Sequence, residues 1–274
     1  MKLAFSSNAF KKTSLEEALD IIAHVGYSGI EIMVDVPHAY PPHMPAARVA
    51  DLKAKIASYR MDVSNLNAFT LFAIGDTYHP TWIESDPALR SQRIEHTANA
   101  IALAKDLGAK TISLQPGGPL LMDDRQAALN LYQQGLERVL DMAKQADILL
   151  MVEPEPGLLI QTSDECAEFL KRVNHPNLKM NCDLGHFYCV GEDPARVVRQ
   201  HAEWIGHVHL EDIAANRVHQ HLIPGRGAMN FPDIFAALKA INWQNWVTVE
   251  LYPYETTPQV AAQEAFDFLQ RFME

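Results

Sequence analysis

Residues 177–190, NLKMNCDLGHFYCV, contain the pattern from which the fold of this 274-residue chain can be inferred. Alternate residues from Leu178 to Cys182 are apolar, which is typical of a β-strand. Asp183, a glycine and His186 then follow at the point where that strand should end. This placement has two interpretations: a turn in which the aspartate caps the next segment, or a reaction centre at the tip of a strand.

The same order of a short apolar run, a loop and an amphipathic stretch recurs along the chain. We expect strands within 2–8, 29–35, 61–69, 110–118, 148–157, 178–186, 205–212 and 246–254, and helices at 15–26, 47–60, 86–108, 129–145, 162–173, 193–204, 231–241 and 258–272. Strict alternation implies a parallel sheet with right-handed crossovers. Eight such units in roughly 250 residues predict an α/β fold, a single (β/α)8 TIM barrel that forms one domain over residues 1–274. The competing open, doubly wound sheet usually carries a glycine-rich fingerprint after its first strand, and AFSSNAF (4–10) contains no glycine.

Composition and charge narrow the functional class. Hydrophobic residues make up 48% of the chain and charged residues 21%, as in a globular protein with a large core. The net charge of −11 disfavours nucleic acids and anionic membranes as partners, because both are bound by clustered Lys and Arg. Three cysteines form no disulfide framework, and we find neither a secretory signal nor a segment that could span a bilayer. We therefore expect a soluble, cytoplasmic protein that acts on a small molecule, with homo-oligomer formation left open.

Polar residues stand at the C-terminal ends of the predicted strands, where the chemistry of a (β/α)8 barrel is located. In chain order these ends carry Asn8, Asp35, Asn67, Gln115, Glu153, Asp183 with His186, His209 with Glu211, and Glu250. Consecutive strands of a closed barrel are neighbours, so the last four ends bring three carboxylates and one imidazole into one sector. Carboxylates at such short distances repel one another unless a cation lies among them. Three carboxylates and one imidazole suit a divalent ion such as Mn²⁺ or Mg²⁺. Any one of these residues could equally be a helix cap or a solvated residue; the repetition over four successive units favours a metal site.

Other polar residues near these ends carry weaker signals. His207 lies two residues before His209 and should point to the same barrel face at a deeper level. Glu155, Glu211 and Asp212 could face a substrate, but we favour their interpretation as ordinary loop carboxylates. Arg217 and Arg226 follow the seventh strand, where each could bind a phosphate or carboxylate or simply be solvated.

The segment TLFAIGDTYHPTW (70–82) is a candidate lid, because loops of this length without predicted structure are often functional. Aromatic residues in the loops could form walls of a pocket, and these are Tyr40, Phe69, Trp82 and Tyr252.

Several of these motifs together resemble the sugar phosphate isomerase/epimerase family, the xylose isomerase-like TIM barrels. The resemblance covers essentially the whole chain, and its specific parts are VEPEPG (152–157), CDLGHFYCVGEDP (182–194), GHVHLED (206–212), PGRGAMNFPDIFAALKAI (224–241) and WVTVEL (246–251). The family includes D-tagatose 3-epimerase, hydroxypyruvate isomerase, inosose dehydratase and a dehydroshikimate dehydratase.

The resemblance implies roles for named residues. Glu153, Asp183, His209 and Glu250 would bind one divalent metal ion, with Mn²⁺ favoured and Mg²⁺, Co²⁺ or Zn²⁺ as alternatives. Glu153 and Glu250 would also act as the acid/base pair, whereas His186 and Arg217 would contact the substrate. The chain departs from the ketohexose epimerases at one position, because they carry a substrate-binding glutamate six residues after the first metal glutamate and this chain has Leu159 there.

These inferences predict a metal-dependent isomerase or epimerase of a sugar or polyol-like keto compound. Glu153 and Glu250 would transfer a proton through an enediolate intermediate. This transfer would either invert the carbon next to the carbonyl group or move the carbonyl group to that carbon. Loss of a β-hydroxyl from the same enediolate would instead make the protein a dehydratase of an inosose- or dehydroshikimate-like substrate. A metal-dependent hydrolase is less well supported, since the first four strand ends offer no histidine. A barrel that only binds a ligand is disfavoured by the intact set of four ligands.

Overall fold

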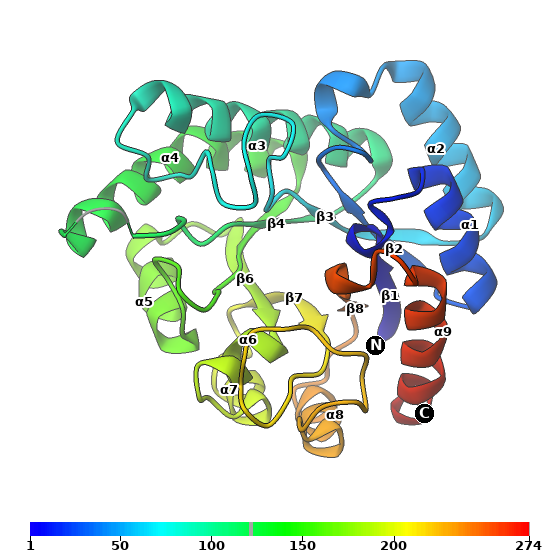
Figure 1. Cartoon of the computed structure of the whole chain (residues 1–274). Coiled ribbons are helices and arrows are strands. Elements are labelled where there is room, and N and C mark those ends of the chain that lie inside the picture. The colour runs from blue at the N-terminus through cyan, green and yellow to red at the C-terminus, as the bar shows by residue number, and fades with distance from the viewer. Residues whose placement is uncertain (121–122, 274) are drawn as a thin grey trace.

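The computed structural model describes residues 1–120 and 123–273 and contains a closed barrel of parallel strands surrounded by helices (Figure 1). Within the described residues the strands are β1 (Lys2–Ser6), β2 (Gly29–Met33), β3 (Asp62–Asn67), β4 (Thr111–Leu114), β5 (Leu149–Val152), β6 (Leu178–Asp183), β7 (Ile205–Leu210) and β8 (Trp246–Val249). They pair in chain order, and β8 closes the ring on β1 through Val247 and Leu3. The predicted (β/α)8 barrel is confirmed.

The helices form the outer layer, and their bounds are close to those expected from the sequence. They are α1 (Leu15–Val25), α2 (Ala46–Ser58), α3 (Pro87–Leu107), α4 (Arg125–Ala146), α5 (Ser163–Val173), α6 (Leu184–Cys189), α7 (Pro194–Gln200), α8 (Phe231–Ala240) and α9 (Pro258–Leu269), with short 3-10 turns η1 (Ser7–Phe10), η2 (Pro41–His43), η3 (Tyr252–Tyr254) and η4 (Gln270–Phe272). Helix α9 lies beside α1 in Figure 1, and Phe266 of α9 packs on Tyr27 with ring centroids 5.1 Å apart. The last helix therefore seals the ring next to the first.

Local sequence signals explain where the helices begin. Side chains of Ser14, Asp86, Asp124, Thr162 and Asp193 accept hydrogen bonds from backbone N–H groups in the first turns of α1, α3, α4, α5 and α7. These N-caps satisfy donors that the helix itself leaves unpaired. Helix α6 was not expected from apolar periodicity, because it is a short turn of helix that begins directly at the end of β6.

The interior of the barrel is polar near its centre, which is unusual because branched apolar side chains dominate most such barrels. Asn65 donates to Glu31 at 2.7 Å and to Ser113 at 3.0 Å. His207 lies 2.9 Å from Thr248 Oγ1, in agreement with the deeper position expected for it. Buried polar groups of this kind are tolerated when they are hydrogen-bonded to one another.

The long segment after β3 is held at both sides by buried charged residues. Asp35 accepts hydrogen bonds from Thr70 Oγ1 and from the backbone N–H groups of Phe72 and Ala73. The fully buried guanidinium of Arg93 donates to the backbone carbonyls of Ala68, Phe69 and Pro80. The candidate lid is thus anchored at its base in the structure. No helix among the described residues has the length and apolar character needed to cross a membrane.

Candidate active site

Four side chains converge at the C-terminal end of the barrel. Glu153 follows β5 directly, Asp183 ends β6, His209 lies in β7 and Glu250 follows β8. One ligand atom from each lies within 4.8 Å of those from the other three, and all four residues are buried. The structure therefore brings together the four residues that the sequence places at successive strand ends.

The donor set and its unpaired atoms fit a divalent metal ion. Glu153 Oε2 and Asp183 Oδ2 are buried and have no hydrogen-bond partner among the described residues. His209 Nδ1 lies 2.8 Å from Glu153 Oε1, 3.8 Å from Asp183 Oδ2 and 3.9 Å from Glu250 Oε1. Orphaned carboxylate oxygens are costly in a buried site, and a cation bound among them would remove that cost.

The pKa values of two residues in the cluster are shifted in the direction expected where negative charge is crowded together. Burial and the neighbouring carboxylates of Glu153 and Glu31 raise the pKa of Glu250 well above its usual range. Burial opposes a charge on His209, but attraction to the surrounding carboxylates raises the pKa of this imidazole well above its ordinary value. Protons thus compete with a metal ion for the same carboxylate and imidazole groups.

Glu31 also belongs to the buried cluster, and it was not expected from the strand ends because it lies inside β2. Its Oε2 is 2.6 Å from His209 Nε2, on the far side of the ring from the three carboxylates. The pairing of β2 with β3 shifts register between Ile30 and Glu31, an irregularity of the kind that re-aims side chains next to active sites. A carboxylate that accepts from the second nitrogen fixes the orientation of a metal-binding histidine. The signal in the sequence was a glutamate in the apolar run GIEIM.

Replacement of Glu31 by glutamine should weaken metal binding without removing a ligand. We expect a loss of about 10- to 100-fold in affinity, because the amide holds the His209 imidazole less firmly and makes it less basic. Titration of chelator-stripped protein with Mn²⁺, beside the exposed control Glu168→Gln, measures the effect. Equal affinities in Glu31→Gln and wild type would show that Glu31 does not support the metal ligand.

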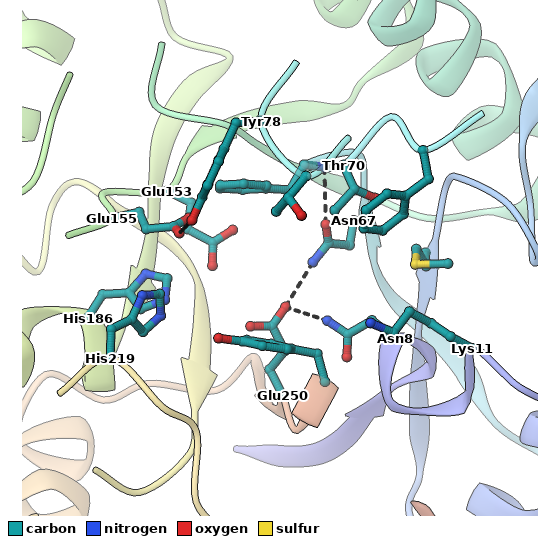
Figure 2. Close-up of a pocket in the computed structure, with 15 residues that line it drawn as sticks. Asn8, Lys11, Asn67, Thr70, Tyr78, Glu153, Glu155, His186, His219 and Glu250 are labelled. Carbon is teal, nitrogen blue, oxygen red and sulfur yellow. Dashed lines mark hydrogen bonds between the residues drawn. The ribbon is translucent and has the colours of Figure 1, made fainter. Parts of the chain in front are cut away.

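Of the four converging residues, Glu153 and Glu250 border a cavity of about 310 Å³. Glu153, Glu250 and His186 line it together with Phe69, Tyr252 and residues of the segment after β3 (Figure 2). Asn8 and Asn67 both donate to Glu250 Oε1, at 2.8 and 3.1 Å. A cavity of this size suits a small substrate.

Two of the four aromatic residues expected as walls lie elsewhere. Trp82 packs on Tyr132 of α4 with ring centroids 5.6 Å apart, and Tyr40 stacks on His96. Neither residue is among those that border the cavity. Tyr78, which the sequence did not single out, borders it instead.

The structure confirms that Asp183 caps the next segment, whereas the reaction centre stays a prediction. Asp183 Oδ1 accepts a hydrogen bond from the backbone N–H of His186 at 2.8 Å and so caps α6. Its Oδ2 is left free to face the other carboxylates. The cap places His186 at the pocket, where its Nδ1 donates to the carbonyl oxygen of Pro154 at 2.9 Å.

The structure does not bring Arg217 to the cavity. Its guanidinium lies over the ring of Tyr188, 4.5 Å from the centroid, and donates to the Tyr188 carbonyl oxygen. Arg226 pairs with Glu264 of α9. Of the lysines and arginines in the described part of the chain, the one that borders the cavity is Lys11, from the segment after β1.

The structure also corrects the interpretation of Glu155 and Glu211 as ordinary loop carboxylates, because both are buried. Glu155 borders the cavity and accepts a hydrogen bond from Tyr78 Oη at 3.1 Å. Burial, with some repulsion from Glu153, raises the pKa of Glu155 to about 7. Burial and the charge of Asp183 raise the pKa of Glu211 well above its ordinary value. In the sequence, Glu155 lies three residues after β5 and Glu211 directly follows β7, at the strand end that also carries His209, but no pattern indicated that either would be buried.

A glycine allows Glu211 to lie so close to Asp183. A Cβ atom on Gly185 would be 1.6 Å from Glu211 Oε1. Gly185→Ala should therefore lower the free energy of unfolding by about 1–3 kcal/mol through overpacking. Urea denaturation of Gly185→Ala, Glu211→Ala and the double variant gives the coupling between the sites, and the double variant should be more stable than the sum of the single effects predicts. Strict additivity would show that no clash occurs.

Comparison with known proteins identifies the family. The family described as "Xylose isomerase-like TIM barrel" matches residues 19–272. The chain belongs to this family. The chain is similar to the inosose dehydratase of Geobacillus thermodenitrificans, which is 27% identical over 205 residues that cover 63% of this chain and 68% of the relative.

Other xylose isomerase-like relatives extend over nearly the full chain. Fructoselysine 3-epimerase of Shigella flexneri is 22% identical over 272 residues, which cover 97% of this chain and 96% of the relative. Among solved structures, the IolI protein with a bound zinc atom superposes with a TM-score of 0.82 at 20% identity, covering 99% of each chain. The relatives are enzymes, namely dehydratases, epimerases and isomerases, which supports an enzymatic role for this chain.

Proposed function

We propose that this protein is a divalent-metal-dependent isomerase or epimerase that acts on a sugar or polyol-like keto compound. The observation that carries the proposal is the convergence of Glu153, Asp183, His209 and Glu250 beside a cavity of about 310 Å³, which Glu153 and Glu250 border. An ion held by these residues would supply a Lewis acid that polarises a substrate carbonyl and stabilises developing negative charge. Mn²⁺ is the ion we favour, because three of the four ligands are carboxylates.

Glu153 and Glu250 are suited to move the proton. They come from β5 and β8 and point toward one another across the pocket (Figure 2). One carboxylate can take the proton from the carbon next to the carbonyl, which leaves an enediolate, and the other can return a proton to the opposite face. Return to the same carbon inverts it, and return to the neighbouring carbon moves the carbonyl group.

Residues around the pair would position the substrate. Asn8 and Asn67 hold the Glu250 carboxylate in one orientation through their hydrogen bonds to Oε1. On the opposite wall, His186 and the Tyr78–Glu155 pair offer donors and acceptors to hydroxyl groups. Lys11, rather than Arg217, is placed to attract a negative group of the substrate.

Dehydration of an inosose-like substrate is the second candidate. Glu155 is a further carboxyl group at the cavity that is not among the four converging residues, and such a group could protonate a leaving hydroxyl group. Relatives from Geobacillus thermodenitrificans and Clostridium beijerinckii carry the name inosose dehydratase. The enediolate is shared by both reactions, so the fate of the neighbouring hydroxyl separates them.

One experiment tests the proposal and separates its two forms. Mn²⁺-loaded protein is incubated in D₂O with a panel of ketoses, inososes, hydroxypyruvate and 3-dehydroshikimate, and each mixture is followed by NMR. Deuterium at the carbon next to the carbonyl, with appearance of an epimer or isomer, supports the first candidate. Loss of water to an unsaturated product supports the second. Protein that binds Mn²⁺ but exchanges no proton in any compound of the panel would contradict both.

A further inference from the structure

A second cavity, which we call the N-terminal cavity, lies at the other end of the barrel from the four converging residues. Its volume is about 560 Å³, against about 310 Å³ for the cavity beside those residues. Residues at or near the N-terminal ends of β3, β4, β5, β7 and β8 border it, together with the C-terminal turns of α2 and α3. Because the chemistry of a (β/α)8 barrel is located at the C-terminal ends of the strands, this cavity is separate from the candidate active site.

The lining of the N-terminal cavity combines apolar walls with buried polar groups. The larger apolar side chains that border it are Ile56, Met61, Leu107, Leu149 and Trp246. Ser64 and His207, which also border it, are almost fully buried. Sites for small molecules typically have this composition, a mostly apolar concave surface with a few polar groups, and volumes of roughly 300–1,000 Å³.

The buried imidazole of His207 has one ring nitrogen to offer to a ligand. Its Nε2 lies 2.9 Å from Thr248 Oγ1, and the same hydroxyl group lies 3.2 Å from Ser64 Oγ. Its Nδ1 has no hydrogen-bond partner in the described part of the chain and is not among the fully enclosed unpaired atoms, so it is open toward the cavity. A polar group in this position is costly without a partner, and a hydrogen bond from a ligand would offset that cost.

The charges at the mouth of the cavity favour an anion. The charged residues that border it are two lysines and one aspartate, namely Lys53, Lys110 and Asp62, in a chain whose net charge is −11. Lys110 and Asp62 each form an exposed ion pair with a residue outside the cavity, at 2.7 and 3.3 Å.

Lys53 is the residue of this set that can balance a new negative charge. Its Nζ donates to the backbone carbonyl oxygen of Asp106 at 3.0 Å, and it has no carboxylate partner among residues 1–120 and 123–273. An ammonium group has three hydrogens, so two remain for an anion. A single uncompensated lysine matches one negative charge better than the two charges of a phosphate group.

We propose that the N-terminal cavity is a binding site for a small organic monoanion, a carboxylate on an apolar body of about the size of one ring. The carboxylate would face Lys53 at the mouth, and the apolar body would pack against Met61 and Trp246. A hydroxyl group on the body would reach Nδ1 of His207. This site does not depend on which reaction the protein catalyses.

The test follows backbone amide shifts in ¹H–¹⁵N NMR spectra of the full chain during titration with benzoate. Benzamide lacks the charge, inorganic phosphate lacks the apolar body, and 3- and 4-hydroxybenzoate add a hydroxyl group. Ala57→Trp places a large side chain at the exposed edge of the cavity, and Lys53→Met removes the charge. Lys105→Met is the matched control, because Lys105 is an exposed lysine in the last turn of α3 that does not border the cavity.

We expect benzoate to shift the amides of Gly108, Gly206 and Asn245 saturably in wild type and in Lys105→Met, and not in Ala57→Trp. Lys53→Met should bind benzoate about fivefold more weakly, the upper end for an exposed ion pair. At least one hydroxybenzoate should bind more tightly than benzoate, and phosphate and benzamide more weakly.

Three results would overturn the proposal. The first is the lack of saturable shifts at these three amides with any of the acids, including the case in which only Asn8 and Phe69 of the first cavity respond. The second is binding that persists unchanged in Ala57→Trp. The third is benzamide or phosphate binding as tightly as benzoate, which would contradict the assigned class of ligand.

Discussion

Glu153→Gln and Glu250→Gln should each lower the rate of proton exchange next to the substrate carbonyl by about 10²–10⁴-fold, the usual contribution of a positioned acid or base. Glutamine keeps the size of each side chain but cannot take up a proton. Both residues are buried in the cluster with Asp183 and His209. The rate is measured by deuterium incorporation into whichever compound of the panel the wild-type protein exchanges.

The two variants must be compared at equal metal loading, because each change also removes a carboxylate that we propose as a metal ligand. Elemental analysis of the same samples provides that correction, and Glu168→Gln on the exposed face of α5 serves as the control. In an epimerase with one glutamate on each face of the substrate, each variant should exchange the proton slowly on the face from which its glutamate was removed. Variants that keep bound metal and exchange at the wild-type rate would rule out the two glutamates as the acid/base pair.

Removal of metal should lower the thermal stability of the protein by several degrees. Buried carboxylates converge on one point, and without a cation they either repel one another or must take up protons. An ion that binds only the folded state stabilises it by about 2.7 kcal/mol at a concentration 100 times its dissociation constant. The effect should therefore be reversed when Mn²⁺ is returned to chelator-treated protein.

The measurement is a thermal melt of chelator-treated protein against increasing Mn²⁺, with Mg²⁺ and Zn²⁺ as comparisons. His209→Gln, which lacks one ligand and the contact to Glu31, should show a much smaller rise in melting temperature. A melting temperature that does not change with any of these ions would indicate that the carboxylate cluster is held protonated and binds no metal.

Residues at the strand ends could be predicted because their positions follow from periodicity alone. Once eight strand–helix units are recognised, closure of the barrel places Glu153, Asp183, His209 and Glu250 on neighbouring strands without knowledge of any side-chain contact. The first residues of the helices could be predicted equally well, because capping residues such as Asp86 and Thr162 bind backbone groups in the first turn of the helix that follows them. The Asp183 motif belongs to both groups, because the residue that caps α6 is also the residue that faces the site.

The paths of the loops were not accessible from the sequence. Arg217 follows the metal-site histidine by eight residues, yet the turn that carries it directs its guanidinium to Tyr188 rather than the cavity. Glu155 was interpreted as an ordinary loop carboxylate, but it is buried and accepts a hydrogen bond from Tyr78 of the segment after β3. His219 and His221 had no recognisable spacing with His186, because contact between them depends on how two separate loops fold together.

By itself, the sequence determined the barrel, the order of its strands and the four residues at successive strand ends, because these depend on local periodicity and on the closed geometry of eight parallel strands. Only the tertiary structure decided which further groups reach those residues. Glu31 contacts His209 from within β2, across the barrel interior, and the register shift beside it is invisible to any pattern within one strand. Gly185 matters because a carboxylate from the next strand lies against it. Such contacts join residues distant in sequence, and the chain specifies them through packing rather than through local pattern.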